Sequence, residues 1–281
     1  MDPINLTLLR DVLLQSLRED VGTGDLTSRA TIPADARASG LYRAKEAVVV
    51  AGIPVIQEIV RLVDPALQFS TIARDGESLS IGAPIATARG SARSILVAER
   101  TSLNFLQRMS GIATLTRRYV DLVQGTGARI VDTRKTVPGL RVVDKYAVAC
   151  GGGMNHRMGL FDGVLIKNNH IAFHSSAGEA VNEARRHLGH LIKIEVEVRT
   201  MSELETAISA GADVILLDNF TPAETRDAVK LVDGRVPLES SGGITLETVR
   251  QFAEAGVDYI SVGALTHSVP AVDIHLRVTR E

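Results

Sequence analysis

Cysteine is almost absent from this 281-residue chain, and tryptophan is absent altogether. The single cysteine, Cys150, excludes an intramolecular disulfide and any metal site built from several cysteines. We expect it to be a small buried residue in a protein of a reducing compartment. Four tyrosines and six phenylalanines leave few rings on which nucleic-acid bases could stack, which disfavours a nucleic-acid-binding protein.

Neither sign of charge predominates, since 31 Lys and Arg residues stand against 33 Asp and Glu residues, a formal net charge of −2. A general nucleic-acid binder would instead have a broad basic surface. No stretch of about 18 uncharged apolar residues is present, so we expect no membrane span. The opening stretch, MDPINLTLLRDVLLQSLRED, is interrupted by acidic residues and is not typical of a signal peptide. We therefore expect a cytoplasmic protein with no nucleic-acid or membrane partner.

Positive charge is nevertheless concentrated in residues 132–170, among glycines and strongly apolar segments. A local cluster of this kind suits a small anionic ligand better than a polyanion. Its basic residues are Arg134, Lys135, Arg141, Lys145, His156, Arg157, Lys167 and His170, and its only acidic residues are Asp132, Asp144 and Asp162.

The first part of the chain alternates short strands with helices. Apolar positions at helical spacing predict helices over 6–20 and 54–63. A long helical run follows over 91–123, with an expected break near Ser110-Gly111. The β-like stretches SGLYRAKE, AVVVAGI, LQFSTIA and ESLSIGAPIATARG are separated by Gly, Pro and Asp. This part of the chain is therefore predicted to be a sheet with helices on one face.

After residue 128 six short apolar runs alternate with helical segments, which predicts parallel strands joined by right-handed crossovers. The runs are ARIVD, GVLIK, LIKIEVEV, ADVILLD, VPLES and VDYISVG. The later helices open with Ser or Thr near the N-cap, and most close on Gly. Since eight strands would close a barrel, the sequence predicts the α/β class and an incomplete (β/α) barrel of about six strands.

Polar residues follow each of these runs, at the ends where barrel active sites lie. Gly242 and Gly243 come between a strand and the predicted helix TLETVRQF, so their N–H groups and the helix start could bind a phosphate, with Gly263 after the next strand. Glu197 and Asp218 lie on neighbouring predicted strands and could hold Mg²⁺ or accept bonds from sugar hydroxyls. Spacing alone does not distinguish Glu197 from Glu195, which shares its strand face.

Arg134, His156, Arg157 and Lys167 form the cationic side of this predicted mouth. Arginine grips a carboxylate or phosphate at two points, whereas lysine acts as a point charge. Several such groups together indicate a ligand with more than one negative group.

The segments that carry these residues resemble quinolinate phosphoribosyltransferases, the decarboxylating nicotinate-nucleotide pyrophosphorylases. The resemblance rests on DTRKTVPGLR, KYAVACGGGMNHRMGLFDGVLIKNNH, EVEV, LLDNF, SSGGI and ISVGALTHS, with EDVGTGDLTS and AERTSLNFLQRMSGIATLT nearer the start. It covers nearly the whole chain. It implies an N-terminal α/β sandwich domain (1–111), an incomplete α/β barrel with the active site (112–268), and a tail (269–281) returning to the first domain.

The resemblance also implies the reaction and its partners. Members transfer phosphoribose from phosphoribosyl pyrophosphate to quinolinate with Mg²⁺, giving nicotinate mononucleotide, pyrophosphate and CO₂ for de novo NAD biosynthesis. They form a homodimer, or a higher assembly of it, in which one subunit supplies an arginine to the other's site. By motif that arginine is Arg100.

The same resemblance implies roles for the remaining residues. Arg134, His156, Arg157 and Lys167 would bind the quinolinate carboxylates, with Lys135 between quinolinate and pyrophosphate. Alignment of LLDNF places Glu197 at the family's glutamate, and whether Glu195 shares its role stays open. The implied catalytic residues are Lys135, Lys167, Glu197 and Asp218. The implied Mg²⁺ side is Glu197 and Asp218, directly or through water or substrate. The implied substrate contacts further include Thr133, Ser241, Gly242, Gly243, Gly263 and His267.

Three other functions remain open from the sequence. A nicotinate or related phosphoribosyltransferase of the same fold, including the molybdenum-operon relatives, would lack the second carboxylate clamp. A Schiff-base aldolase would use Lys167 and would be trapped by borohydride with a carbonyl substrate. A regulatory module that binds phosphosugars would keep the glycines but show no turnover.

Overall fold

The computed structural model describes residues 4–281, which form two compact units. The first unit contains the chain up to Arg117 together with residues 136–152 and 265–281, and the second contains residues 118–135 and 153–264. The predicted domain limits placed 136–152 in the second domain. This segment instead forms helix α5 (Arg141–Cys150) of the first unit, and Cys150 is buried there as predicted. Residues 1–3 of the predicted N-terminal domain lie outside the described residues.

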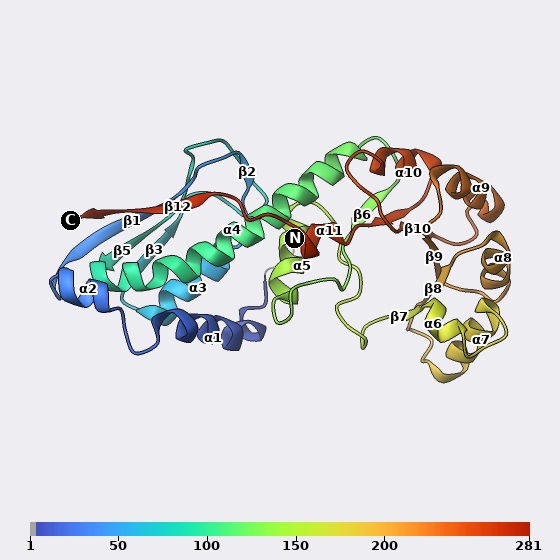
Figure 1. The fold of residues 1–281 in the computed structure, drawn as a ribbon, viewed down its shortest axis with the longest axis horizontal. Coiled ribbons are helices and arrows are strands. Elements are labelled where there is room, and N and C mark those ends of the chain that lie inside the picture. The colour runs from blue at the N-terminus through green and yellow to red at the C-terminus, as the bar shows by residue number, and fades with distance from the viewer. Residues whose placement is uncertain (1–3) are drawn as a thin grey trace. The chain divides into compact units, whose positions relative to one another are not determined.

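An antiparallel sheet forms the base of the first unit, with strand order β12-β1-β5-β3 (Figure 1). Its strands are β1 (Arg37–Ala44), β3 (Gln68–Thr71), β5 (Pro84–Ser91) and β12 (Ile274–Arg280). A separate two-stranded pair joins β2 (Val48–Val49) to β4 (Ser78–Leu79). Because β12 pairs with β1 along seven residues, the chain ends as a strand of the first unit.

Helices cover one face of this sheet and close its core. Tyr42 and Ile85 from the sheet pack with Ile56 and Ile95 from the helices, and all four are almost completely buried. The apolar spacing that predicted the helices reflects this burial. The helices are the 3₁₀ turn η1 (Leu6–Leu8), α1 (Arg10–Val21), α2 (Leu26–Thr31), α3 (Ile53–Val63) and α4 (Ala92–Leu122).

The predicted break at Ser110-Gly111 is wrong, since α4 runs unbroken for 31 residues. Both residues serve packing at this point. The Ser110 hydroxyl accepts a hydrogen bond from the backbone N–H of Ala51 (3.1 Å). A Cβ at Gly111 would lie 2.3 Å from the carbonyl oxygen of Pro270, so only glycine lets that segment lie against the helix. The glycine that predicted a break in the helix instead allows the backbone at Pro270 to lie close to α4.

A buried ion pair holds α5 to α4 within the first unit. Arg108 donates to both carboxylate oxygens of fully buried Asp144, from Nε at 2.9 Å and from Nη2 at 2.7 Å. The same guanidinium reaches the carbonyl of Thr266 (3.1 Å). The paired hydrogen bonds offset the loss of hydration of both charges.

We predict that Asp144→Asn destabilises the protein by about 3 kcal/mol, because it leaves the Arg108 guanidinium partly buried without its counter-charge. Urea denaturation followed by circular dichroism measures the change. Asp227→Asn is the matched control, since Asp227 makes only an exposed pair with Lys230 and should change stability by less than about 0.5 kcal/mol. Equal midpoints for the two variants would contradict a stabilising role for the buried pair.

Six parallel strands form the sheet of the second unit, which confirms the predicted α/β class (Figure 1). The strand order is β6-β11-β10-β9-β8-β7, so the two strands nearest the start of the unit are the two edges. β11 pairs with β6, and the barrel is open between the edge strands β6 and β7. The strands are β6 (Arg129–Val131), β7 (Val164–Ile166), β8 (Ile194–Val198), β9 (Val214–Asp218), β10 (Leu238–Ser241) and β11 (Tyr259–Ser261).

Helices α7 (Ala177–His187), α8 (Met201–Ser209), α9 (Pro222–Val232) and α10 (Val249–Ala255) lie along the outer side of this sheet (Figure 1). Three of them begin as predicted at hydroxyl N-caps, because Ser176, Thr200 and Thr221 accept a backbone N–H of the first turn. Short helices α6 (Asn168–Ile171) and α11 (Ala264–His267) follow β7 and β11.

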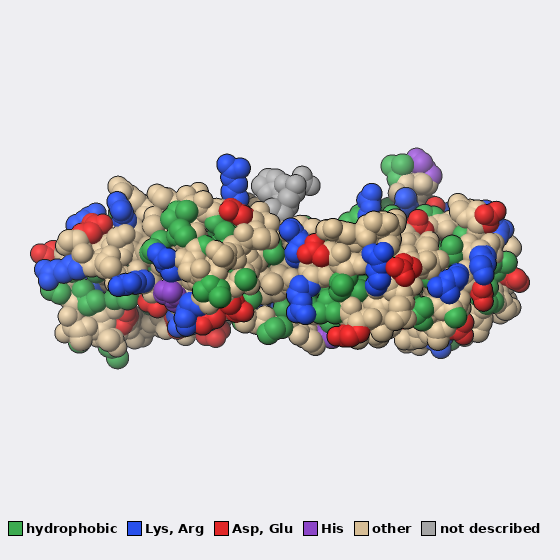
Figure 2. Space-filling view, turned by 90° about the horizontal axis from the view of Figure 1, so that it is seen from above, with side chains coloured by type: hydrophobic (Ala, Val, Ile, Leu, Met, Phe, Trp, Pro, Cys, Tyr) green, Lys and Arg blue, Asp and Glu red, His purple; other side chains and the backbone are tan. Residues whose placement is uncertain are grey.

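On the face shown in Figure 2, Lys and Arg side chains are interspersed with Asp and Glu rather than gathered in one broad basic area. This distribution agrees with the balanced charge of the sequence. Within residues 4–281 no helix combines the length and the apolar character that crossing a membrane requires.

Candidate active site

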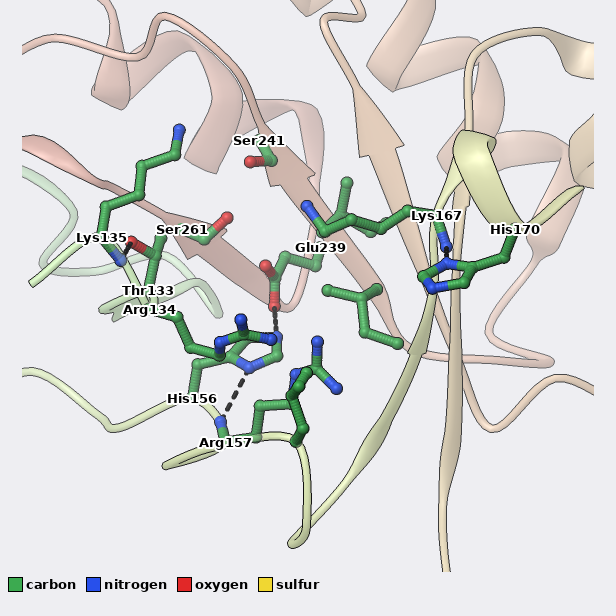
Figure 3. A pocket seen from close by; sticks show the side chains of 13 residues that line it. Thr133, Arg134, Lys135, His156, Arg157, Lys167, His170, Glu239, Ser241 and Ser261 are labelled. Carbon is green, nitrogen blue, oxygen red and sulfur yellow. Dashed lines mark hydrogen bonds and ion pairs between the residues drawn. The ribbon is translucent and has the colours of Figure 1, made fainter. Parts of the chain in front are cut away.

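A pocket of about 480 Å³ lies at the carboxyl ends of the parallel strands of the second unit (Figure 3). Its volume is that of a small-molecule site. Four cationic side chains line it: Arg134 and Lys135 follow β6, Arg157 comes from the segment between α5 and β7, and Lys167 follows β7. The lining residues are Thr133, Arg134, Lys135, His156, Arg157, Leu160, Leu165, Lys167, His170, Leu216, Glu239, Ser241 and Ser261.

Asp132 positions the segment that carries His156 and Arg157. It is fully buried at the end of β6, and its carboxylate accepts hydrogen bonds from the His156 N–H (2.9 Å) and the Asn155 side chain (2.7 Å). A parallel bridge between Val131 and Met154 extends this contact. The glycine-rich segment therefore returns beside β6. Sequence reasoning missed Asp132, whose only signal was its place at the end of an apolar run.

One guanidinium nitrogen of Arg157 is hydrogen-bonded to the protein, and another makes no hydrogen bond among the described residues. Its Nη1 donates to the carbonyl of Gly163 (2.8 Å), whereas its buried Nε makes no hydrogen bond among the described residues. Burial lowers the pKa of Arg157, and the charge of Arg134 lowers it further, while Glu195 and Asp162 act in the opposite direction. Two guanidinium groups that repel each other at one end of a pocket favour an anionic ligand that would bind both.

His156 lies between these cations and the acidic interior of the barrel. Its Nδ1 accepts the backbone N–H of Arg157 (2.7 Å), so its Nε2 carries the proton that is donated to Glu195 (2.9 Å). The second carboxylate, Glu239, is 3.9 Å from the same Nε2. Within residues 4–281, these three residues are the only group of three or more His, Cys, Asp or Glu side chains close enough together to hold a metal ion.

Glu239 and Ser261 were not among the predicted site residues, although both line the pocket. Ser241 and Ser261 pair across β10 and β11, and Glu239 lies two residues before Ser241 on the same strand face. Counting back by two from the predicted Ser241 would have identified Glu239. Burial and then the charge of Glu195 raise the pKa of Glu239 to about 7.

Glu197 and Asp218 do not line the pocket but lie beside it on one face of the sheet. Glu197 is opposite Leu216 in the register, so Asp218 follows two residues later on the same face. Lys167 Nζ lies 3.4 Å from Glu197, and Arg199, a cation that sequence reasoning missed, lies 4.0 Å from Asp218. Two carboxylates that can be completed by water and substrate phosphates suit Mg²⁺. These residues therefore fit the metal that the resemblance implies.

Gly242 and Gly243 form a turn with positive φ after β10. A Cβ on Gly242 would lie 2.2 Å from Oδ1 of Asn219, which itself has a φ of 60°. The helix predicted over 245–252 begins later than expected: α10 starts at Val249, after a turn at residues 246–248. Backbone N–H groups of the turn, rather than a helix start, are therefore the available anion donors.

Two predicted substrate-binding residues belong to the first unit and not to the unit that forms the pocket. Arg100 is an exposed residue of α4, and His267 is an exposed residue at the end of α11. Gly263 directly precedes α11.

Family models match almost the entire chain. Residues 25–110 match the N-terminal domain of quinolinate phosphoribosyl transferase, and residues 112–277 match its C-terminal domain. The chain belongs to the quinolinate phosphoribosyltransferase family. The resemblance drawn from the sequence motifs is therefore confirmed, and with it the assignment to an enzyme family of phosphoribosyltransferases.

Relatives within this family are similar along their whole length. The chain is 45% identical over 276 residues to a probable nicotinate-nucleotide pyrophosphorylase (carboxylating) of Bacillus subtilis, covering 98% of this chain and 95% of that protein. A chloroplastic nicotinate-nucleotide pyrophosphorylase of Arabidopsis thaliana is 44% identical, covering 97% and 83%. The crystal structure of NadC from Streptococcus pyogenes has a TM-score of 0.96 at 38% identity and covers 100% of both chains.

Proposed function

We propose that this protein transfers phosphoribose from phosphoribosyl pyrophosphate to quinolinate, releasing pyrophosphate and CO₂ and forming nicotinate mononucleotide for NAD biosynthesis. The observation that carries this proposal is the convergence of Arg134, Lys135, Arg157 and Lys167 in one pocket. The names of the Bacillus subtilis and Arabidopsis thaliana relatives support the same reaction.

Quinolinate has two adjacent carboxylates on a pyridine ring, and the cosubstrate carries a phosphate and a pyrophosphate. Removing such anions from water without counter-charges costs several kcal/mol for each charge. In this proposal Arg134 and Arg157 bind the carboxylates, with His156 and Lys167 beside them. Lys135 lies between the ring and the pyrophosphate, and the turn of Gly242 and Gly243 after β10 donates backbone N–H groups to the 5-phosphate.

Attack by the ring nitrogen on the anomeric carbon develops positive charge on the ribose while pyrophosphate departs. Lys135 stabilises the charge on the leaving group, and Glu197 and Asp218 accept hydrogen bonds from the ribose or hold Mg²⁺. When bound, the metal would neutralise charge on the pyrophosphate oxygens. The quaternary nitrogen then withdraws electrons from the adjacent ring carbon, so CO₂ leaves without a Schiff base. Orientation of the two substrates supplies much of the remaining acceleration.

We further propose a homodimer in which Arg100 of one subunit completes the site of its partner. The exposure of Arg100 on α4 supports this role, because an arginine that binds an anion in another subunit must be accessible on its own.

Quinolinate is labelled in the carboxylate on the ring carbon next to nitrogen and incubated with phosphoribosyl pyrophosphate and Mg²⁺. We expect the label to be released as CO₂. Nicotinate, which lacks one carboxylate, is expected to react at least about 100-fold less efficiently, because the buried cations would lose a partner. Chelation of divalent cations should abolish turnover, and Mg²⁺ should restore it. Equal turnover of quinolinate and nicotinate would favour a nicotinate phosphoribosyltransferase instead.

A further inference from the structure

Glu239 is the one carboxylate among the residues that line the cationic pocket. It projects from β10 toward His156 (Figure 3) and is 3% exposed. Its Oε1 is buried and makes no hydrogen bond within residues 4–281. A bare carboxylate at this position would repel the dicarboxylate that the four cations are placed to bind. Binding of such a ligand therefore favours a neutral, protonated Glu239 over an ionised one that pairs with a cation.

On balance the surroundings of Glu239 favour its protonated form. The Nε2 proton of His156 is committed to Glu195, at 2.9 Å, and is 3.9 Å from Glu239. Burial raises the pKa of Glu239 most, and the carboxylates of Glu195 and Asp132 raise it further, whereas His156 and the Ser261 hydroxyl lower it. A bound dicarboxylate would add negative charge and favour the neutral acid still more.

The proposed reaction needs a proton donor at this end of the pocket. When the carbon–carbon bond to the departing carboxylate breaks, its electron pair stays on the ring carbon next to the quaternary nitrogen. That carbon must gain a proton before product leaves. Arginine is a poor proton donor because its guanidinium holds its proton far more tightly than a carboxylic acid does, so Arg134 and Arg157 can bind the substrate but not supply this proton.

We propose that Glu239 is the catalytic acid that protonates the ring carbon from which CO₂ departs, an inference that rests on the proposed function. The O–H bond of the Glu239 carboxylic acid breaks as the new C–H bond forms, and its electron pair remains on the carboxylate. Water from the open mouth returns the proton after product release. The Nε2 proton of His156 stays hydrogen-bonded to Glu195, so His156 does not neutralise Glu239.

The test separates the two chemical steps in one sample. In single-turnover experiments, Glu239→Gln should release pyrophosphate within about threefold of the wild-type rate but CO₂ at least about 100-fold more slowly, because an unprotonated ring carbon recaptures CO₂. Glu239→Asp, which keeps a shorter acid, should recover part of the CO₂ release. Glu205→Gln, at an exposed glutamate of α8, is the matched control and should behave as wild type.

The pH dependence gives a second readout. Since the acid form is the active one, the wild-type rate of CO₂ release should fall as pH rises through the pKa of Glu239, which is about 7 without ligand and higher beside a bound dicarboxylate, and Glu239→Gln should lack this fall. Glu195→Gln removes a negative neighbour and should move the fall to lower pH. Pyrophosphate and CO₂ released together by Glu239→Gln would overturn this inference alone. Absence of CO₂ from the wild-type protein would overturn the proposed function and this inference with it.

Discussion

Arg157→Ala is expected to weaken quinolinate binding by about 10- to 150-fold and to leave phosphoribosyl pyrophosphate binding within about twofold of wild type. A charge-assisted hydrogen bond contributes roughly 1.5–3 kcal/mol, which corresponds to this range of dissociation constants. The buried Nε of Arg157 makes no hydrogen bond among the described residues, so its binding capacity is available to a ligand. Calorimetric titration with each substrate measures both constants.

Arg157→Lys is the matched variant, since it keeps the charge but loses the planar fork that can bind one carboxylate at two points. Its affinity for quinolinate should lie between that of the Arg157→Ala protein and that of the wild type. A folded Arg157→Ala protein that binds both ligands like wild type would show that this side chain does not contact quinolinate.

A mixture of Arg100→Ala and Lys135→Ala proteins is expected to regain about a quarter of the wild-type activity, although each variant alone should have less than about 1%. In a random mixture about half of the dimers are hybrids, and in a two-fold symmetric hybrid one site carries both substitutions while the other carries neither. Activity is measured after subunit exchange under mild denaturation and refolding.

Subunit exchange itself must be demonstrated by differently tagged chains that co-purify. Mixing either variant with itself by the same procedure is the control and should give no recovery. If hybrids form and remain inactive, Arg100 and Lys135 act in the same subunit, and the proposed sharing of the site is wrong.

Local patterns in the sequence were sufficient for most of the fold. Apolar runs located all six parallel strands, and hydroxyl residues located the starts of α7, α8 and α9, because strand burial and N-capping depend on residues close in the chain. The pattern failed at Gly111. A glycine that breaks a helix and a glycine that admits a neighbouring backbone look the same in sequence, and the neighbour here is Pro270, far along the chain.

The cationic side of the site was also predictable, since Arg134, Lys135 and Lys167 follow strand ends and Arg157 lies in a glycine-rich motif of the family. The acidic side was not. Asp132 and Glu239 looked like ordinary residues of apolar runs, and their importance depends on contacts across the barrel with residues 155–156 and with His156 and Glu195.

The sequence by itself determined the fold class, the family and the positive charge of the pocket, because strand periodicity, capping and the identity of charged side chains are local properties. The tertiary structure alone decided which charges meet. The raised pKa of Glu239, the tautomer of His156 and the lack of a hydrogen bond from Arg157 Nε among the described residues depend on burial and on partners far apart in the chain. Electrostatic energies vary with the distance between charges in space and with their exposure to water, and neither quantity can be read from the order of the residues along the chain.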